Sequence, residues 1–206
     1  MMFTPCGPSA VPTGGAGVAL PAAADALSDA LECEQFLVMS AGHVQPGSDA
    51  ETEVKKLGPA ACFVQADVSK KADCQRVVTE AVSAFGRVDI LVNNVGGSQG
   101  TPRFTEEISV DVWRRVIDFC ITSQFLCCQA VVPIMQAKKY GRIVNVSSVA
   151  GPFGEPLIWS PSYSAAKSGV CAMVRQLALE LGHEVVVVSG PVEIDYPSAA
   201  ERIDVV

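Results

Sequence analysis

VDILVNN, at residues 88–94, is a short apolar run that ends in two asparagines. A run that is apolar on both faces is typical of a strand whose sheet is covered by helices on both sides. Four more runs of this kind are QFLVMS (35–40), ACFVQ (61–65), GRIVNVSS (141–148) and EVVVVSG (184–190). Helical patterns lie between or beside them at residues 21–33, 49–57, 70–85, 109–139 and 161–181. This alternation predicts an α/β fold with a doubly wound parallel sheet and right-handed crossovers.

The length and charge of the chain limit the classes of protein to consider. Its 206 residues, of which 49% are hydrophobic and 18% charged, suit one domain with a sizeable core, so we assign residues 1–206 to a single domain. The net charge of −7 argues against a nucleic acid or an anionic membrane as partner. No apolar run approaches the about 20 residues that span a bilayer. The first residues lack the basic start and apolar centre of a signal peptide, so we expect a cytoplasmic protein.

Eight cysteines raise the question of disulfides or a metal site. They contain no Cys-x-x-Cys pair, and the two histidines, His43 and His183, are far apart in the sequence. Metal sites need clustered ligands at recurring spacings. Most of these cysteines stand among apolar residues, where a free cysteine behaves as a small hydrophobe. We therefore expect no metal.

Small and polar residues follow three of the predicted strands. These residues are Asp67, the segment 93–97 and the pair Ser147-Ser148. In a doubly wound sheet, ligands bind at the carboxyl ends of the strands, where the strand order reverses. A helical pattern then begins with Tyr163 and Lys167, which are four residues apart and so share one helix face. A cation near a phenol lowers the pKa of the phenol, which suits proton transfer near pH 7.

Five motifs together resemble the short-chain dehydrogenase/reductase family. They are ADVS (66–69), GRVDILVNNVGG (86–97), GRIVNVSSVAG (141–151), YSAAKSG (163–169) and SGPV (189–192). They stand in the family's order, and the resemblance is strongest over residues 58–192. It implies a Rossmann-like fold and an NAD(P)-dependent oxidoreductase that transfers hydride between the nicotinamide and a secondary alcohol or ketone.

The resemblance also implies a role for individual residues. Tyr163 matches the acid/base, Ser148 the hydrogen-bond donor to the substrate oxygen, and Lys167 the group that holds the nicotinamide ribose and lowers the tyrosine pKa. Further positions match the cofactor site: Asp67 and Val68 at the adenine, Asn94 and Gly96 beside the cofactor ribose, and Val192 at the carboxamide.

The segment that resembles the family's phosphate loop departs from its pattern. Thr13, Gly14 and Gly17 match the loop, but Gly17 comes one residue early and the last glycine is absent. The expected first strand, CGPSAVP (6–12), contains two prolines, which cannot donate to a sheet ladder. The second strand ends in Ser40-Ala41 instead of the acid that binds the ribose of NAD. The cofactor is therefore NAD or NADP, and the missing acid slightly favours NADP.

Two more departures concern Cys120 and the end of the chain. The family usually has asparagine at the position of Cys120, where it holds a water that links the lysine to solvent. Twelve residues follow SGPVEI, so we expect the sheet to lack the family's usual last strand and the substrate pocket to be open on one side.

Two hypotheses for the function follow. The first is an active oxidoreductase, supported by Ser148, Tyr163 and Lys167. The second is a non-enzymatic or truncated relative that keeps a dinucleotide-binding fold without turnover, supported by the altered loop, Cys120 and the short tail. The helices at 109–139 and 161–181 carry apolar residues on more than one side and meet their copies in the family, so we expect a homodimer or a higher homo-oligomer.

Overall fold

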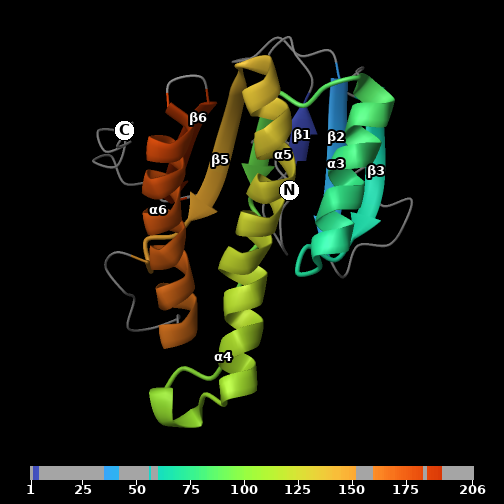
Figure 1. Ribbon diagram of the computed structural model, residues 1–206. Coiled ribbons are helices and arrows are strands. Elements are labelled where there is room, and N and C mark those ends of the chain that lie inside the picture. The colour runs from blue at the N-terminus through green and yellow to red at the C-terminus, as the bar shows by residue number, and fades with distance from the viewer. Residues whose placement is uncertain are drawn as a thin grey trace.

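The computed structural model describes residues 2–4, 35–41, 56, 60–151, 160–182 and 185–191. Six strands form one sheet in the order β3-β2-β1-β4-β5-β6 (Figure 1). The strands are β1 (Met2–Thr4), β2 (Gln35–Ala41), β3 (Ala60–Ala66), β4 (Ile90–Asn93), β5 (Gly141–Ser147) and β6 (Val185–Pro191). The helical elements are α3 (Lys71–Phe85), the 3₁₀ turn η1 (Thr105–Glu107), α4 (Val110–Ile117), the π-helical turn η2 (Asp118–Thr122), α5 (Ser123–Lys138) and α6 (Pro161–Leu181).

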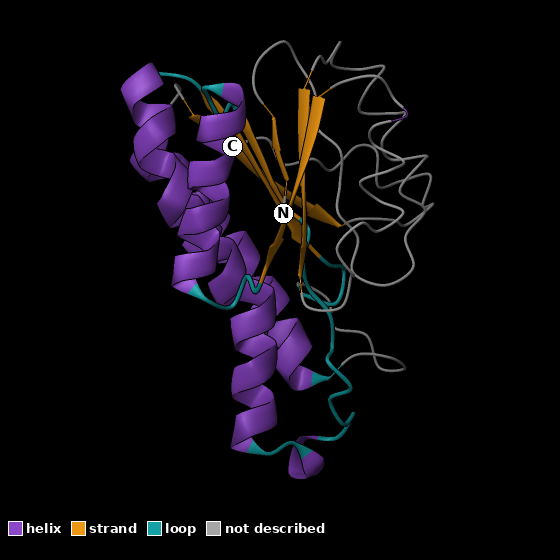
Figure 2. Ribbon diagram, turned by 90° about the vertical axis from the view of Figure 1, so that its right-hand side faces the viewer, coloured by secondary structure: helices purple, strands orange, loops and turns teal. Residues whose placement is uncertain are grey.

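The helices α3, α5 and α6 pack on one face of this sheet, as the edge-on view in Figure 2 shows. The parallel pairs β2–β3, β4–β5 and β5–β6 confirm the α/β class with parallel crossovers. The helices expected at residues 21–33 and 49–57 lie outside the described residues, apart from Lys56, which is helical.

β1 corrects the expectation of an all-parallel sheet. It runs antiparallel to both of its neighbours, with Met2 paired to Val38 of β2 and to Val92 of β4. The proline-containing segment 6–12, which we expected to supply the first strand, lies outside the described residues. Met2–Thr4 contains no proline, so all three of its residues can donate to a ladder, and an antiparallel pair needs no helical crossover.

The core lies between the sheet and these helices. All four residues of β4 are buried, which explains why that run carries no polar alternation. α3 contributes a stripe at helical spacing, made of Cys74, Val77, Val78 and Ala81. Full burial of a valine or leucine side chain stabilises a fold by about 1.5–3 kcal/mol, so this stripe fixes α3 on the sheet beside α5.

A π-helical turn divides the single helix expected at residues 109–139. The side chain of Ser109 caps the start of α4 by accepting a hydrogen bond from the Val112 N–H at 3.2 Å. η2 then separates α4 from α5, and Cys120 is buried within it. By length and composition alone, Val110–Lys138 could cross a membrane. Its buried residues Val131 and Met135, however, belong to the core that packs against the sheet, which is typical of a helix that covers a sheet.

Candidate active site

The first turns of α6 position Tyr163 and Lys167. Ser160 is the N-cap, and its hydroxyl accepts a hydrogen bond from the Tyr163 N–H at 3.4 Å, while Pro161 occupies the first turn. The helix therefore begins where the sequence predicts it, and Tyr163 packs in a buried cluster with Val116 of α4 and Cys120 of η2. The Lys167 Nζ lies 5.8 Å from the centre of the Tyr163 ring. Both residues are buried, with 7% of Tyr163 and 2% of Lys167 exposed.

Ser148 follows β5 and lies in a tight turn that is attached to α6. Its hydroxyl accepts a hydrogen bond from the Ala150 N–H at 3.2 Å, and its carbonyl accepts one from the Gly151 N–H at 3.0 Å. The Ser168 hydroxyl donates to the Gly151 carbonyl at 2.6 Å. A Cβ on Gly151 would lie 3.0 Å from the backbone of Lys167, so a side chain here would require the turn or α6 to move by a few tenths of an ångström. This turn places the Ser148 side chain in hydrogen-bond contact with Tyr163.

The pKa of Tyr163 differs in direction from the sequence expectation. Burial raises it above its ordinary value, and the hydrogen bond with Ser148 offsets only part of that rise. The expected lowering by Lys167 is wrong for this arrangement, because the ammonium group donates to the Val146 carbonyl at 2.7 Å. Tyr163 is therefore a neutral phenol, suited to donate a proton, throughout the neutral pH range.

Lys167 lies in a narrow space between the sheet and the loop that follows β4. The Val146 carbonyl, which accepts from its ammonium group, also accepts from the Gln124 side-chain amide at 3.2 Å. Burial lowers the pKa of Lys167. On the other side, a Cβ on Gly96 would lie 2.8 Å from the Lys167 Nζ. The absence of a side chain at Gly96 thus makes room for the ammonium group.

Cys120 ties η2 to the same loop. Its thiol donates to the Gly97 carbonyl at 3.3 Å and accepts from the Gly97 N–H at 3.4 Å. Burial raises the pKa of this thiol, and the positive charge of Lys167 offsets only part of the rise. Cys120 is therefore a neutral thiol that holds the loop after β4 beside Lys167.

Asp67 and Val68 lie at the carboxyl end of β3. The Asp67 carboxylate accepts from the Ser69 N–H at 3.1 Å and from its hydroxyl at 2.6 Å, and it pairs with Lys70 at 3.0 Å. The hydrogen bond from Ser69 is the main cause that lowers the pKa of Asp67. The Asp67 N–H donates to the Asp73 carboxylate at 2.7 Å, which fixes the turn to α3. These hydrogen bonds fix the backbone of the turn at the position that the resemblance assigns to the adenine.

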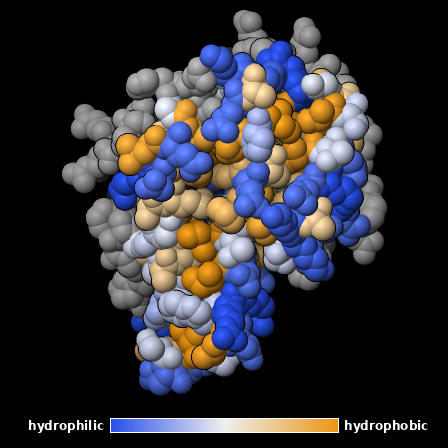
Figure 3. All heavy atoms as spheres, in the orientation of Figure 1, coloured by the Kyte–Doolittle hydropathy of each residue, from blue (hydrophilic) through white to orange (hydrophobic). Residues whose placement is uncertain are grey.

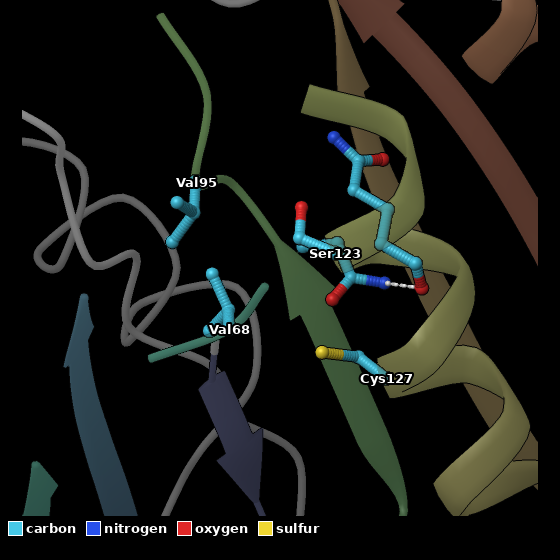
Figure 4. A pocket seen from close by; sticks show the side chains of 6 residues that line it. Val68, Val95, Ser123 and Cys127 are labelled. Atoms are coloured by element: carbon cyan, nitrogen blue, oxygen red, sulfur yellow. Dashed lines mark hydrogen bonds between the residues drawn. The ribbon is translucent and has the colours of Figure 1, made fainter. Parts of the chain in front are cut away.

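A small pocket connects this turn with the loop after β4. Val68 and Val95 lie on one side of it, and Ser123 and Cys127 of α5 lie on the other (Figure 4). Asn94 and Gly96 flank Val95 on the same loop. In the described part of the chain, Ser148, Tyr163, Lys167 and Gly96 thus lie together. Val68, which follows Asp67, lies on the other side of Val95 and lines the small pocket with it. Thr13, Gly14, Gly17 and Val192 lie outside the described residues.

Several residues of the site were not predicted from the sequence. Gln124 shares the Val146 carbonyl with Lys167, and its polar side chain gave no clear signal because Gln129 and Gln136 stand on the same helix. The Ser147 hydroxyl donates to the Lys167 carbonyl at 2.8 Å and lies 3.2 Å from the Cys171 thiol. Ser147 therefore positions the turn of α6 that carries Lys167. Among the described residues, no group of His, Cys, Asp and Glu has the arrangement of a metal site.

A buried pair of asparagines, Asn93 and Asn145, connects the two strands whose loops carry the site. The Asn93 amide of β4 donates to the Asn145 side-chain oxygen of β5 at 2.9 Å, and the two residues are register partners in the sheet. Asn93 also contacts the Cys128 thiol and the Gln124 carbonyl, both at 3.4 Å. These contacts connect the ends of β4 and β5 to α5, so that the two loops of the site start from one rigid unit.

Comparisons with known proteins agree on one family. A family model described as short chain dehydrogenase matches residues 13–195. A 3-oxoacyl-[acyl-carrier-protein] reductase from Synechocystis sp. is 35% identical over 150 residues, which are 71% of this chain and 59% of that protein. A 1,6-dihydroxycyclohexa-2,4-diene-1-carboxylate dehydrogenase from Acinetobacter baylyi is 38% identical over 128 residues, which are 62% of this chain and 47% of that protein. The chain thus spans about half of the length of the curated relatives that it matches.

Proposed function

Because the chain belongs to the short-chain dehydrogenase/reductase family, we propose that it is an NAD(P)-dependent oxidoreductase acting on a secondary alcohol or a ketone. The observation that carries this proposal is the meeting of Ser148, Tyr163 and Lys167 beside the loop that follows β4. These residues supply the hydrogen bond, the proton and the cation that such a reaction requires.

The residues around Lys167 fit a dinucleotide. Gly96 presents backbone without a side chain close to the carboxyl end of β4, and the ammonium group lies next to it. Glycines at the carboxyl ends of strands let the backbone approach a dinucleotide closely, and an ammonium group can donate hydrogen bonds to hydroxyl oxygens. Lys167, Asn94 and Gly96 would hold the nicotinamide ribose, and Asp67 and Val68 the adenine. When bound, the nicotinamide supplies or accepts the hydride.

In the direction of reduction, Tyr163 donates its phenolic proton to the carbonyl oxygen of the substrate. Ser148 donates a hydrogen bond to the same oxygen and stabilises the negative charge that develops on it. Lys167 compensates the negative charge of the phenolate that Tyr163 becomes. To do so, the Lys167 ammonium group moves toward the Tyr163 hydroxyl and loses its hydrogen bond to the Val146 carbonyl. Because burial raises the pKa of Tyr163, oxidation of an alcohol, which needs the phenolate, requires a higher pH than reduction.

The cofactor is NAD or NADP. β2 ends in Ser40-Ala41, with no acid to bind the adenosine ribose of NAD, which slightly favours NADP. The two relatives are named for a 3-oxoacyl-[acyl-carrier-protein] and for a 1,6-dihydroxycyclohexa-2,4-diene-1-carboxylate. Both compounds carry an oxygen on a secondary carbon, in agreement with the proposed substrate class.

A titration of the purified chain with NADPH and with NADH, followed by cofactor fluorescence, tests the first step of this proposal. A panel of ketones, including 3-oxoacyl thioesters, then tests turnover with whichever cofactor binds. We expect binding of NADPH and a rate that Tyr163→Phe abolishes without loss of binding. Binding without turnover on the whole panel would favour the second hypothesis, a non-enzymatic relative. The contact of Lys167 with Val146 in place of the Tyr163 hydroxyl is the observation in favour of that alternative.

We also propose that the chain is a cytoplasmic homo-oligomer. Trp113 of α4, Phe125 of α5 and Leu179 of α6 are 39%, 45% and 76% exposed. Apolar side chains also gather along the groove between α3 and α5 and beside α4 in the view of Figure 3. A second copy would cover the exposed apolar residues of α5 and α6. Sedimentation at micromolar concentration should show a dimer or larger species, and a monomer would contradict the proposal.

A further inference from the structure

Two cysteines outside the catalytic group lie in contact across a helix pair. The thiols of Cys74 in α3 and Cys127 in α5 are 3.6 Å apart. Both are buried, with 0% and 1% of their surfaces exposed, and Cys127 lines the small pocket beside Val68 and Val95 (Figure 4). Two thiols this close need only a short movement to form a covalent bond.

Cys74 also holds the turn at the carboxyl end of β3. Its thiol donates a hydrogen bond to the Val68 carbonyl at 3.3 Å, and its neighbour Asp73 accepts one from the Asp67 N–H at 2.7 Å. Adjacent residues at the start of α3 thus hold backbone groups of two consecutive residues of this turn, Asp67 and Val68. A movement of Cys74 therefore moves the backbone that would meet the adenine.

The contact between the two thiols and their burial both affect their acidity. The hydrogen bond with Cys127 lowers the pKa of Cys74, whereas burial raises the pKa of Cys127 well above its ordinary value. A thiolate is the attacking species in disulfide formation. The contact between the two sulfur atoms therefore places the thiolate of either residue beside the sulfur that it would attack.

We propose that Cys74 and Cys127 form a reversible disulfide that weakens cofactor binding by displacing the Val68 backbone. The part that concerns the cofactor rests on the function proposed above. The two thiols lose their protons and two electrons, one S–S bond forms, and a small two-electron oxidant, such as a diazene or a low-molecular-weight disulfide, is reduced. The sulfur atoms approach from 3.6 Å to the about 2.05 Å of a disulfide. The hydrogen bond from Cys74 to Val68 is lost, because the oxidised sulfur has no hydrogen to donate.

The first experiment maps the bond. The reduced full chain is treated with diamide, a diazene, its remaining thiols are alkylated, and its peptides are analysed by mass spectrometry without reduction. We expect a Cys74–Cys127 linked peptide in the parent chain and in Cys128→Ser, and none in Cys127→Ser. Cys128 is a matched control because it is the next residue of α5, but its thiol contacts Asn93 and Asn145 instead. Failure to form the linked peptide, while the denatured chain oxidises readily, would overturn the proposal.

The second experiment measures the consequence for the cofactor. The affinity for NADPH should fall about tenfold on oxidation, as loss of one or two backbone contacts would cause. Dithiothreitol should restore it, and Cys127→Ser should show no change with diamide. An unchanged affinity in the linked protein would refute the effect on binding. If the reduced chain binds neither NADPH nor NADH, the proposed function fails and the effect on binding fails with it, while the peptide map decides by itself whether the disulfide forms.

Discussion

Replacing Gly96 by alanine tests whether this position makes room for Lys167, to which we assign a catalytic role. The new Cβ would lie 2.8 Å from the Lys167 Nζ and 3.3 Å from its Cε, whereas an ordinary contact begins at 3.4 Å. The ammonium group must therefore move by about 0.6 Å, the difference between 3.4 and 2.8 Å. Because the end of a lysine side chain can yield, we expect the fold to remain intact.

The magnitude follows from the sensitivity of catalysis to position. A misplacement of 1 Å can cost about a hundredfold in rate, so a shift of about 0.6 Å should lower kcat/KM about tenfold, or about 1.4 kcal/mol in the activation free energy. The added methyl group also removes water from around the ammonium group. The pKa of Lys167, which burial already lowers, should therefore fall further and change the pH profile of the rate.

Gly97→Ala is the matched control for this prediction. Its Cβ would lie 3.9 Å from the Phe119 ring, an ordinary contact, and its backbone bonds to Cys120 would remain. The assay measures initial rates with a ketone that the parent chain accepts, together with urea unfolding of each variant. Equal rates in the two variants, with both folded, would refute the reasoning that Gly96 serves to accommodate Lys167.

Four further outcomes are expected. Tyr163→Phe should abolish turnover and leave cofactor affinity nearly unchanged, because it removes the proton but keeps the ring; substantial residual activity would show that another group supplies the proton. Burial raises the pKa of Tyr163 above its ordinary value of about 10, so its contribution to stability is present below about pH 10 and is lost as the pH rises further. In urea unfolding between about pH 8 and 11, the unfolding free energy of Tyr163→Phe should therefore decline less than that of the parent chain. Identical declines in the two proteins would contradict this. Cys120→Asn should raise turnover with little change in cofactor affinity, because an amide orders water better than a thiol; an equal or lower rate in a folded variant would make Cys120 a packing residue. Asp89→Asn should lower the unfolding free energy by about 2 kcal/mol, because the buried carboxylate pairs with Arg87 at 2.6 Å and with Lys138 at 3.1 Å. Both cations are partly exposed, which limits the strength of these pairs. A loss below about 0.5 kcal/mol in urea unfolding would show that the pairs contribute little.

The strands and α6 were predictable because their signals are local. Apolar runs locate β2 to β6 to within a residue or two, and Pro161 and Gly182 mark the ends of α6. The antiparallel direction of β1 could not be predicted, because its three residues carry no periodicity and its direction depends on distant strands. The π-helical turn at Asp118–Thr122 could not be predicted from the sequence either, because the apolar pattern of the helix continues through it.

The site was predictable in its residue types and less so in its contacts. The spacing of Tyr163 and Lys167 indicates a shared face, and the structure places both residues there. The partner of Lys167 is the carbonyl of Val146, a backbone atom that no residue type reveals. The direction of the Tyr163 pKa was wrong because the sequence indicates the nearby cation but gives no measure of burial, which dominates here.

Because the π-helical turn η2 lies between α4 and α5, the orientation of α4 can change without a change in the position of α5 on the sheet. A π-helical turn carries one residue more than the α-helical turn it replaces, and each residue rotates a helix by about 100°. Deleting one residue from 118–122 would convert η2 to an ordinary helical turn and rotate α4 relative to α5, while Cys127 and Val131 could keep their places on the sheet. η2 is thus the joint at which the extra residue of a π-helical turn accompanies the contact of Cys120 with Gly97. An insertion or deletion of one residue in η2 would therefore change the wall of the proposed active site by rotating α4, which a substitution cannot do.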